Sequence, residues 1–430
     1  MAELFDDLPE AGSGKARATG RARLREPSRD QVTMQVFDLD GLIDETHPAR
    51  LIWAYASQVD MSSFEASVKA REGTPGMAQT SPHLLLALWL YATSDGVGSA
   101  RALARNCETV AAYRWLCGGV GVNHRLLSEF RNDQAARIES LLCAHVASLS
   151  AAGIIDLDEV AQDGVRVRAS AGSSSFRRRK TLDQRLDQAK ALLKKLARQS
   201  DDDEDGPSGR ARRAAQDRAD RVQRALEALG EAEKLQAKRE AKHRNKEVRA
   251  STTDPDALVM KMADGGFRPA YNVQFASTPT TGIILSVWCA PIGSDAGMAE
   301  PMAQRLKKVY GRRPKRHLVD GGYQNAPCIE AAEAAGTVFY CPPKKSRHGG
   351  DPCEPRPKDT PAIARWRLRM ASEEGQAIYR RRALAELIHA KLRNLHLDRL
   401  RVRGRAKVEN WMRWFALVSN IFTAARLQPA

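Results

Sequence analysis

The chain has 430 residues, a formal net charge of +16 and a pI of about 9.7, and hydrophobic residues make up 43% of it. This length allows two or three domains, and the absence of any run of eighteen apolar residues excludes a membrane-spanning helix. The positive charge favours a polyanionic partner, of which nucleic acid is the commonest, and seven scattered cysteines without a Cys-x-x-Cys pair favour reduced thiols.

The N-terminal third is expected to be a basic arm followed by a helical domain. Residues 1–30 are rich in Gly, Ala, Arg, Ser and Pro and have little to bury, which predicts disorder. From residue 31 to about 150 the pattern is helical. Ser81-Pro82, Ser99 and Asn123 are predicted helix starts, and Gly118-Gly119 is a predicted stop.

Short helices with tight breaks predict a helix-turn-helix-like unit in residues 31–150 that binds DNA. A helical packing domain with ordinary surface arginines is the alternative. The candidates for contacts with phosphate are Arg101, Arg105, Arg114, Arg125 and Arg131.

A second domain, residues 151–430, begins with strands at about 154–170 and is interrupted by an insertion at about 177–250. Two leucine- and alanine-rich stripes at helical spacing, around Leu182–Leu196 and Val222–Ala232, flank the acidic run DDDEDGPSG. This pattern predicts an antiparallel helical hairpin. The hairpin either grips DNA or a second protomer, or only packs against the domain.

The rest of this domain mixes strands and helices. Strands are predicted at 271–276, 283–288, 317–319 and 338–340, and helices at 299–310 and 410–427, with a Pro- and Gly-rich loop at 341–361. The order of these elements predicts an α/β fold with a mixed sheet.

Three acids stand out by their neighbours. Asp163 and Asp320 each follow a strand-like run and precede glycine, which lets the backbone approach a ligand closely. Residues 379–393 are predicted to form one helix, in which steps of three, four and seven residues place Glu386 on one face with an aromatic hydroxyl and two guanidinium groups. Three carboxylates are the minimum for holding two divalent cations over a phosphodiester. Aspartates in tight turns and a solvated basic helix face are the alternative interpretations.

Together these three parts resemble the DDE transposases of bacterial insertion sequences, which have a ribonuclease-H-like catalytic domain. The family signature on the last helix is Tyr, two residues, Arg, three residues, Glu, six residues, Lys. Tyr379, Arg382 and Glu386 match it, and Arg393 stands where the family has lysine. Arginine keeps the charge but offers a fork of donors instead of a point charge. The resemblance extends from about residue 35 to the C-terminus.

The resemblance implies a transposase that cuts the ends of its element and joins them to target DNA. Asp163, Asp320 and Glu386 would bind two Mg²⁺ ions, for which Mn²⁺ substitutes, while Tyr379, Arg382 and Arg393 would contact DNA. It further implies double-stranded DNA as partner, a homodimer on DNA, no membrane, and a place in the bacterial cytoplasm at the nucleoid. A metal-dependent nuclease without strand transfer, and a domesticated DNA-binding protein that has lost catalysis, remain open alternatives.

Overall fold

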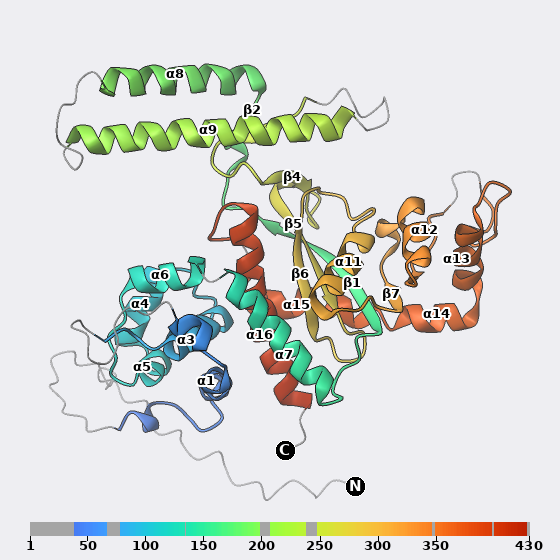
Figure 1. The fold of residues 1–430 in the computed structure, drawn as a ribbon, viewed down its shortest axis with the longest axis horizontal. Helices are drawn as coiled ribbons and strands as arrows, with labels where there is room; N and C mark the ends of the chain where they lie inside the picture. The colour runs from blue at the N-terminus through green and yellow to red at the C-terminus, as the bar shows by residue number, and fades with distance from the viewer. Residues whose placement is uncertain are drawn as a thin grey trace, which may run out of the picture.

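The computed structural model describes residues 38–66, 78–133, 135–197, 207–237, 247–345, 349–397 and 400–427. The predicted arm, residues 1–30, lies outside these ranges. Figure 1 shows three regions: a group of N-terminal helices on one side, a central sheet covered by helices, and a long helical hairpin along the top. Within the described residues, no helix is both long and apolar enough to cross a membrane.

The central sheet is mixed and is built around β1 (Glu159–Arg168). The strand order is β4 (Leu258–Lys261), β5 (Phe267–Ser277), β1, β7 (Arg316–Leu318) and β8 (Val338–Tyr340). The remaining strand, β6 (Ile284–Ala290), pairs with residues 272–277 of β5, on the same edge as β4. β5 runs antiparallel to β1, whereas β7 and β8 run parallel to it. This mixed sheet confirms the predicted α/β, ribonuclease-H-like fold class.

The last helix, α16 (Arg405–Leu427), fills the core against this sheet. Its apolar side chains are buried as predicted, among them Trp411, Trp414 and Phe415. Asn420 fixes the helix to the edge of β6, because its amide accepts from Ile284 N at 2.7 Å and donates to Ile284 O at 2.8 Å. The buried amide is therefore satisfied in an otherwise apolar contact.

The N-terminal helices are short, and their ends follow local capping signals. Ser99 accepts from Ala102 N and Asn123 accepts from Leu126 N, which confirms both predicted caps, and Gly118 ends its helix with a φ of 55°. The helices are α1 (Pro48–Gln58), α2 (Ser62–Glu65), α3 (Pro82–Ser94), α4 (Ala100–Thr109), α5 (Ala111–Cys117), α6 (His124–Asp133) and α7 (Ala135–Ala151).

Arg131 is not available to phosphate in this structure, which makes its predicted role wrong. The guanidinium is buried, with its central carbon 4.4 Å from the ring centre of Trp89 and 4.7 Å from that of Trp411. It donates to Gly98 O at 2.8 Å. Cation–π contacts of this kind stabilise a desolvated arginine, so Arg131 joins the N-terminal helices to α16.

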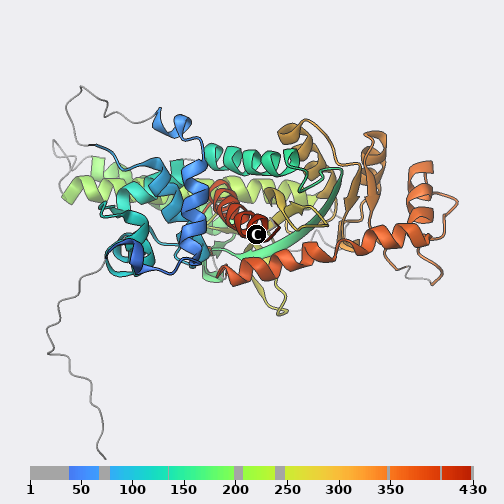
Figure 2. The same cartoon turned by 90° about the horizontal axis from the view of Figure 1, so that it is seen from below.

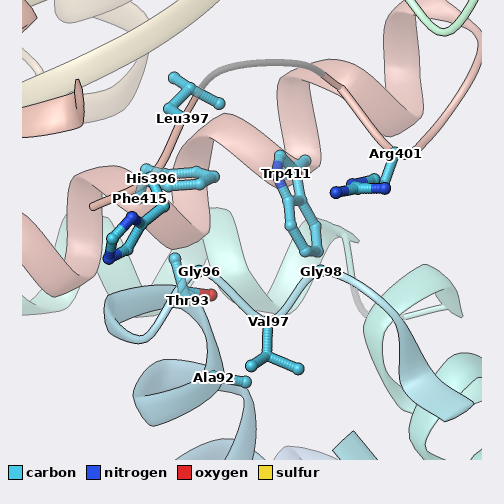
Figure 3. Close-up of a pocket in the computed structure, with 10 residues that line it drawn as sticks. All are labelled: Ala92, Thr93, Gly96, Val97, Gly98, His396, Leu397, Arg401, Trp411 and Phe415. Atoms are coloured by element: carbon cyan, nitrogen blue, oxygen red, sulfur yellow. The ribbon is translucent and has the colours of Figure 1, made fainter. Parts of the chain in front are cut away.

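A small pocket marks the same junction (Figure 3). Gly96 and His396, both with positive φ, meet there, and a Cβ at Gly96 would lie 2.6 Å from the Cβ of His396. Only glycine fits this close approach. The N-terminal helices are thereby held against the segment that follows the predicted signature helix.

The inserted hairpin is confirmed as two antiparallel helices, α8 (Arg179–Ala197) and α9 (Pro207–Ala237). It buries its own apolar cluster of Leu182, Val222, Ala225 and Leu229. The short pair β2 (Phe176–Arg177) and β3 (Ala250–Ser251) connects it to the main sheet region.

The remaining helices follow the central strands. The predicted bounds of α11 (Ala299–Tyr310) and β8 are confirmed. Short 3₁₀ turns lie at Asp40–Leu42, Ser173–Ser175 and Gly321–Tyr323. The other helices are α12 (Ala326–Ala334), α13 (Pro361–Ala371), α14 (Glu373–Arg380) and α15 (Ala383–Asn394).

Candidate active site

The parallel pairing of β1 and β7 brings two of the predicted acids together. Ala161 lies opposite Leu318, and Asp163 and Asp320 each follow two residues later. Because neighbouring strands are about 4.8 Å apart, side chains at matched positions are close. In accord with this, the negative charge of Asp320 raises the pKa of Asp163.

Asp163 lies in the middle of β1 and not at a strand end, which corrects the sequence interpretation. The strand continues to Arg168 because β5 pairs with it residue by residue, with Asp163 opposite Phe275. Glycine is needed at position 164 because neighbouring side chains come close to it, and not because the chain turns there. A Cβ there would lie 2.5 Å from Nε2 of Gln274 and 2.7 Å from Oδ1 of Asp295.

Asp320 stands directly beyond the end of β7, as predicted. Its carboxylate accepts a hydrogen bond from Gly322 N at 2.7 Å and caps the short 3₁₀ turn Gly321–Tyr323. The backbone carbonyl of Asp320 accepts a hydrogen bond from the thiol of Cys341 at 3.1 Å. The aspartate is thus oriented by its own turn and by the strand next to it.

Buried polar side chains from residues next to the two acids form a hydrogen-bond network. Gln274 on β5 accepts from Nε2 of Gln162 at 2.7 Å and from the hydroxyl of Tyr323 at 2.5 Å, and it donates to Asp295 at 2.8 Å. Gln162 precedes Asp163, and Tyr323 ends the turn that Asp320 caps. The network therefore couples the positions of both acids.

The signature segment 379–393 is two helices and not one. α14 ends at Arg380 and α15 begins at Ala383, with Arg381 N bonded to Ile378 O and Arg382 N bonded to Tyr379 O. These bonds span three residues and tighten the turn. As a result, adjacent arginines reach two acids of β1: Arg381 lies 3.3 Å from Glu159, and Arg382 lies 3.5 Å from Asp163.

Arg382 connects the predicted residues of α14 and α15 with the sheet. Its Nη2 lies 2.6 Å from Oε1 of Glu386, and its guanidinium carbon lies 5.9 Å from the ring centre of Tyr379. The side chain is 10% exposed, and its Nη1, which faces Asp163, makes no hydrogen bond to any residue that the structure describes. A buried N–H without a hydrogen-bond partner is well suited to an anionic ligand.

Glu386 and Arg393 lie on the outer part of α15. The side chain of Glu386 is 62% exposed and is held by Arg382, and Arg393 is exposed two turns further along. Among the described residues, Arg393 forms no ion pair with Asp163 or Asp320, and the partner of Glu386 is Arg382.

His389 belongs to this site and was not predicted. Its Nε2 lies 3.5 Å from Oδ2 of Asp163 and has no hydrogen-bond partner among the described residues. Burial lowers the pKa of His389, while Asp163 acts in the opposite direction. His389 is seven residues after Arg382 and three after Glu386, so helical spacing alone places it on their face.

The electrostatics of Asp163 reflect this crowding. Burial raises the pKa of its carboxyl group, His389 and Arg382 oppose that rise, and Asp320 adds to it. Two carboxylates so close repel each other when both are ionised. A cation between them removes that penalty.

The donor set fits a divalent metal in part. Asp163 and Asp320 supply adjacent hard oxygen ligands, which suit magnesium. In the described part of the chain, however, no group of three or more acids, histidines or cysteines is arranged to hold a metal ion. Glu386 does not join the pair here because its carboxylate binds Arg382.

Two family models match the chain. The model described as Transposase DDE domain matches residues 246–421, and the model described as Transposase domain (DUF772) matches residues 37–133. The first match includes Asp320 and Glu386 and begins after Asp163 and the inserted hairpin. No curated protein and no solved structure matches the chain.

Proposed function

Since this chain belongs to the DDE-type transposases of insertion sequences, we propose that it cleaves the ends of its own element and transfers the freed strands to target DNA. The observation that carries the proposal is the side-by-side position of Asp163 and Asp320, with Glu386 tied to Asp163 through Arg382. This is the carboxylate set that two-metal phosphodiester chemistry needs.

Transposases of this type use divalent metals, and we propose Mg²⁺, with Mn²⁺ as a substitute. Asp163, Asp320 and Glu386 would hold the ions, which supply an activated water or 3′-hydroxyl and charge stabilisation at the leaving oxygen. Glu386 can join the other two only after its bond to Arg382 opens. An incoming phosphate can replace the carboxylate on that arginine, because phosphate can accept two parallel hydrogen bonds from a guanidinium group, whereas Glu386 accepts one.

The side chains of Arg382, Tyr379 and Arg393 then have separate roles in binding DNA. Nη1 of Arg382 forms an ion pair with Asp163 but no hydrogen bond among the described residues, and it would bind a nonbridging phosphate oxygen. Tyr379 packs beside Arg382 and limits its movement. Arg393 would hold the next phosphate along the strand, two helical turns away, a distance of about 10 Å.

The N-terminal helical domain, residues 31–150, would bind element-end DNA, and two copies would bridge the two ends. Arg101, Arg105 and Arg125 are exposed on α4 and α6, while Arg114 is half-buried on α5. The net charge of +16 supports this partner. We propose a cytoplasmic, nucleoid-associated enzyme on the same grounds.

The test uses the purified chain, duplex DNA carrying the flanks of its own gene, and Mg²⁺. The parent should cut at the element ends and give joined products with a target plasmid. Asp320→Asn should lose more than about 100-fold in cleavage, since even outer-shell partners of metal ligands typically contribute 10–100-fold. It should bind end DNA at least as well as the parent, because one like charge near phosphate is removed.

Other outcomes separate the alternatives. Cleavage without joined products would mean a nuclease without strand transfer. Binding without cleavage by the parent would mean a DNA-binding protein that has lost catalysis. If Asp320→Asn stays folded but loses binding in proportion to cleavage, the aspartate is structural.

A further inference from the structure

His389 on α15 turns an unbonded ring nitrogen towards the acids of the sheet. Its Nε2 is buried and lies 3.5 Å from Oδ2 of Asp163, and it makes no hydrogen bond to any residue that the structure describes. Hydrogen bonds in proteins are about 2.7–3.2 Å long. The imidazole nitrogen and the carboxylate oxygen are therefore neighbours without a hydrogen bond between them.

The fold holds His389 in this position. α15 lies against β1, and its side chains Ala385, Ile388 and Leu392 are buried. His389 is four residues after Ala385 and three before Leu392, so it lies on the same face of the helix. Figure 2 shows the orange-red helices α14 and α15 end to end along one side of the molecule, with the green strand β1 beside α15.

The carboxylate of Asp163 has one oxygen that is not hydrogen-bonded. Oδ1 accepts from Gly164 N at 2.9 Å, whereas Oδ2 has only Nη1 of Arg382 and Nε2 of His389 beside it in the described part of the chain, each at 3.5 Å. The buried Nη1 of Arg382 also lacks a hydrogen bond there. Buried polar atoms are normally satisfied by a partner. A cation beside Oδ2 and Nε2, with an anionic oxygen on Nη1, would satisfy all three.

The spacing of Oδ2 and Nε2 suits two ligands of one metal ion. Carboxylate oxygen and imidazole nitrogen both bind metals at about 2.1 Å, which puts two such ligands about 3.0 Å apart at an octahedral angle and about 3.4 Å apart at a tetrahedral one. The observed 3.5 Å is close to these separations. Magnesium takes oxygen ligands, whereas first-row transition metals also accept imidazole.

We propose that His389 is a metal ligand together with Asp163, that its nitrogen makes the site prefer Mn²⁺ to Mg²⁺, and that Arg382 holds a DNA phosphate beside the ion. The proposal rests on the proposed function, to whose three carboxylates it adds a nitrogen ligand. Phosphate oxygens and water complete the ligand set, as they do in other metal sites that act on phosphates. The charge of Arg382 opposes the cation until phosphate neutralises it, so metal binding should depend on DNA.

The experiment detects Mn²⁺ on the full chain by pulsed electron paramagnetic resonance, in which a coordinated imidazole gives a nitrogen hyperfine coupling. The sample contains duplex DNA from one flank of the gene, already cut and ending in a 3′-dideoxynucleotide, so that no reaction follows. The parent should show the coupling. His389→Gln should lose it and should bind Mn²⁺ about tenfold or more weakly, since even outer-shell partners of metal ligands contribute 10–100-fold. The affinity for Mg²⁺, measured by competition, should stay at the parental value.

The matched control is His396→Gln, which replaces an exposed histidine directly beyond α15 and should keep both the coupling and the Mn²⁺ affinity. If His389→Gln melts below the parent, the measurement is repeated on the parent with its histidines labelled with the heavy nitrogen isotope. The coupling must then change to that of the heavy isotope, whereas a coupling from DNA bases would not.

Two results overturn the proposal: a parent without nitrogen coupling, and a coupling that persists unchanged in His389→Gln. Either would leave His389 as a packing residue beside Asp163. A parent that cuts and joins DNA but shows no histidine coupling defeats only this inference. A parent that shows the coupling but never cuts DNA defeats only the proposed function.

Discussion

The sheet side and the helix side of the candidate site differ in how firmly the fold holds them. Asp163 is 14% exposed, its backbone is bonded on β1, and Asp320 is oriented by its own turn. Glu386 is 62% exposed and has one partner, Arg382. The sheet acids are positioned by backbone register, whereas the third acid is positioned by a single side chain.

This difference indicates a division of work. A ligand pair that must stay close despite like charge needs a rigid backbone, which parallel strands provide. A third ligand that must exchange a guanidinium for another partner needs freedom, which an exposed side chain in the first turn of α15 provides. Arg382 is the contact between the two sides, so its removal tests the comparison most severely.

Arg382→Ala should destabilise the protein by about 3 kcal/mol, because removing one partner of a buried ion pair leaves the other charge uncompensated. Arg381→Ala is the matched control. Arg381 precedes it in the chain, is 51% exposed and lies 3.3 Å from Glu159. Glu159 is itself buried but keeps Arg316 at 2.6 Å when Arg381 is removed, so the loss of this half-exposed pair should cost less than about 1 kcal/mol. Urea unfolding at pH 7 measures both variants. Equal stability of the two would show that the sheet acids need no cation from α15.

The rigidity of the sheet side can be tested through His317 on β7. The ring is fully buried and neither nitrogen has a hydrogen bond within the described part of the chain, and burial lowers its pKa to about 3. An unfolded histidine titrates near 6.5, so below that pH the unfolded chain binds a proton that the folded chain does not bind. Stability is therefore full above pH 6.5 and falls as the pH drops towards 3.

From these pKa values, the titration of His317 should lower the free energy of unfolding by about 2 kcal/mol when the pH is reduced from 7 to 5. His317→Leu should show a pH dependence smaller by that amount in urea unfolding at the two pH values, whatever its stability at pH 7. An unchanged pH dependence would mean that the folded strand admits the proton and that the sheet side is looser than its burial indicates.

Several parts of this architecture could be read from local sequence. The strand before Asp320, the buried face of α16 and the paired stripes of α8 and α9 each carry their own periodicity, which does not depend on distant residues. The family resemblance added the grouping of the three acids. The physical reason for the closeness of Asp163 and Asp320, the parallel pairing of β1 with β7, is a long-range contact.

The parts that could not be predicted depend on residues far apart in the chain. The break between α14 and α15 occurs where Arg381 and Arg382 reach β1, more than two hundred residues earlier. Arg131 is buried because Trp411, on the last helix, supplies one of its two aromatic faces. Propensity favoured a continuous helix and an exposed arginine, and tertiary contacts overrode both.

The smallest expected effect concerns Arg393, where the chain departs from the family signature. Arg393 is exposed on α15, two turns beyond Glu386, so it should reach the phosphate next to the cleaved bond. Arg393→Ala should reduce cleavage by about tenfold or more, because a charged hydrogen bond contributes about 1.5–3 kcal/mol. Arg393→Lys should keep substantial activity, because charge dominates a phosphate contact.

The control is Arg380→Ala, which removes the same charge from an exposed position at the end of α14. Single-turnover cleavage of pre-bound end DNA separates a local phosphate contact from general affinity. If Arg393→Ala and Arg380→Ala both cut at the parental rate, Arg393 is an ordinary surface residue and the helix side acts through Glu386 and Arg382 alone. If only Arg393→Ala is slow and Arg393→Lys restores the rate, the exposed end of α15 holds DNA by charge while the buried sheet acids hold their place by register.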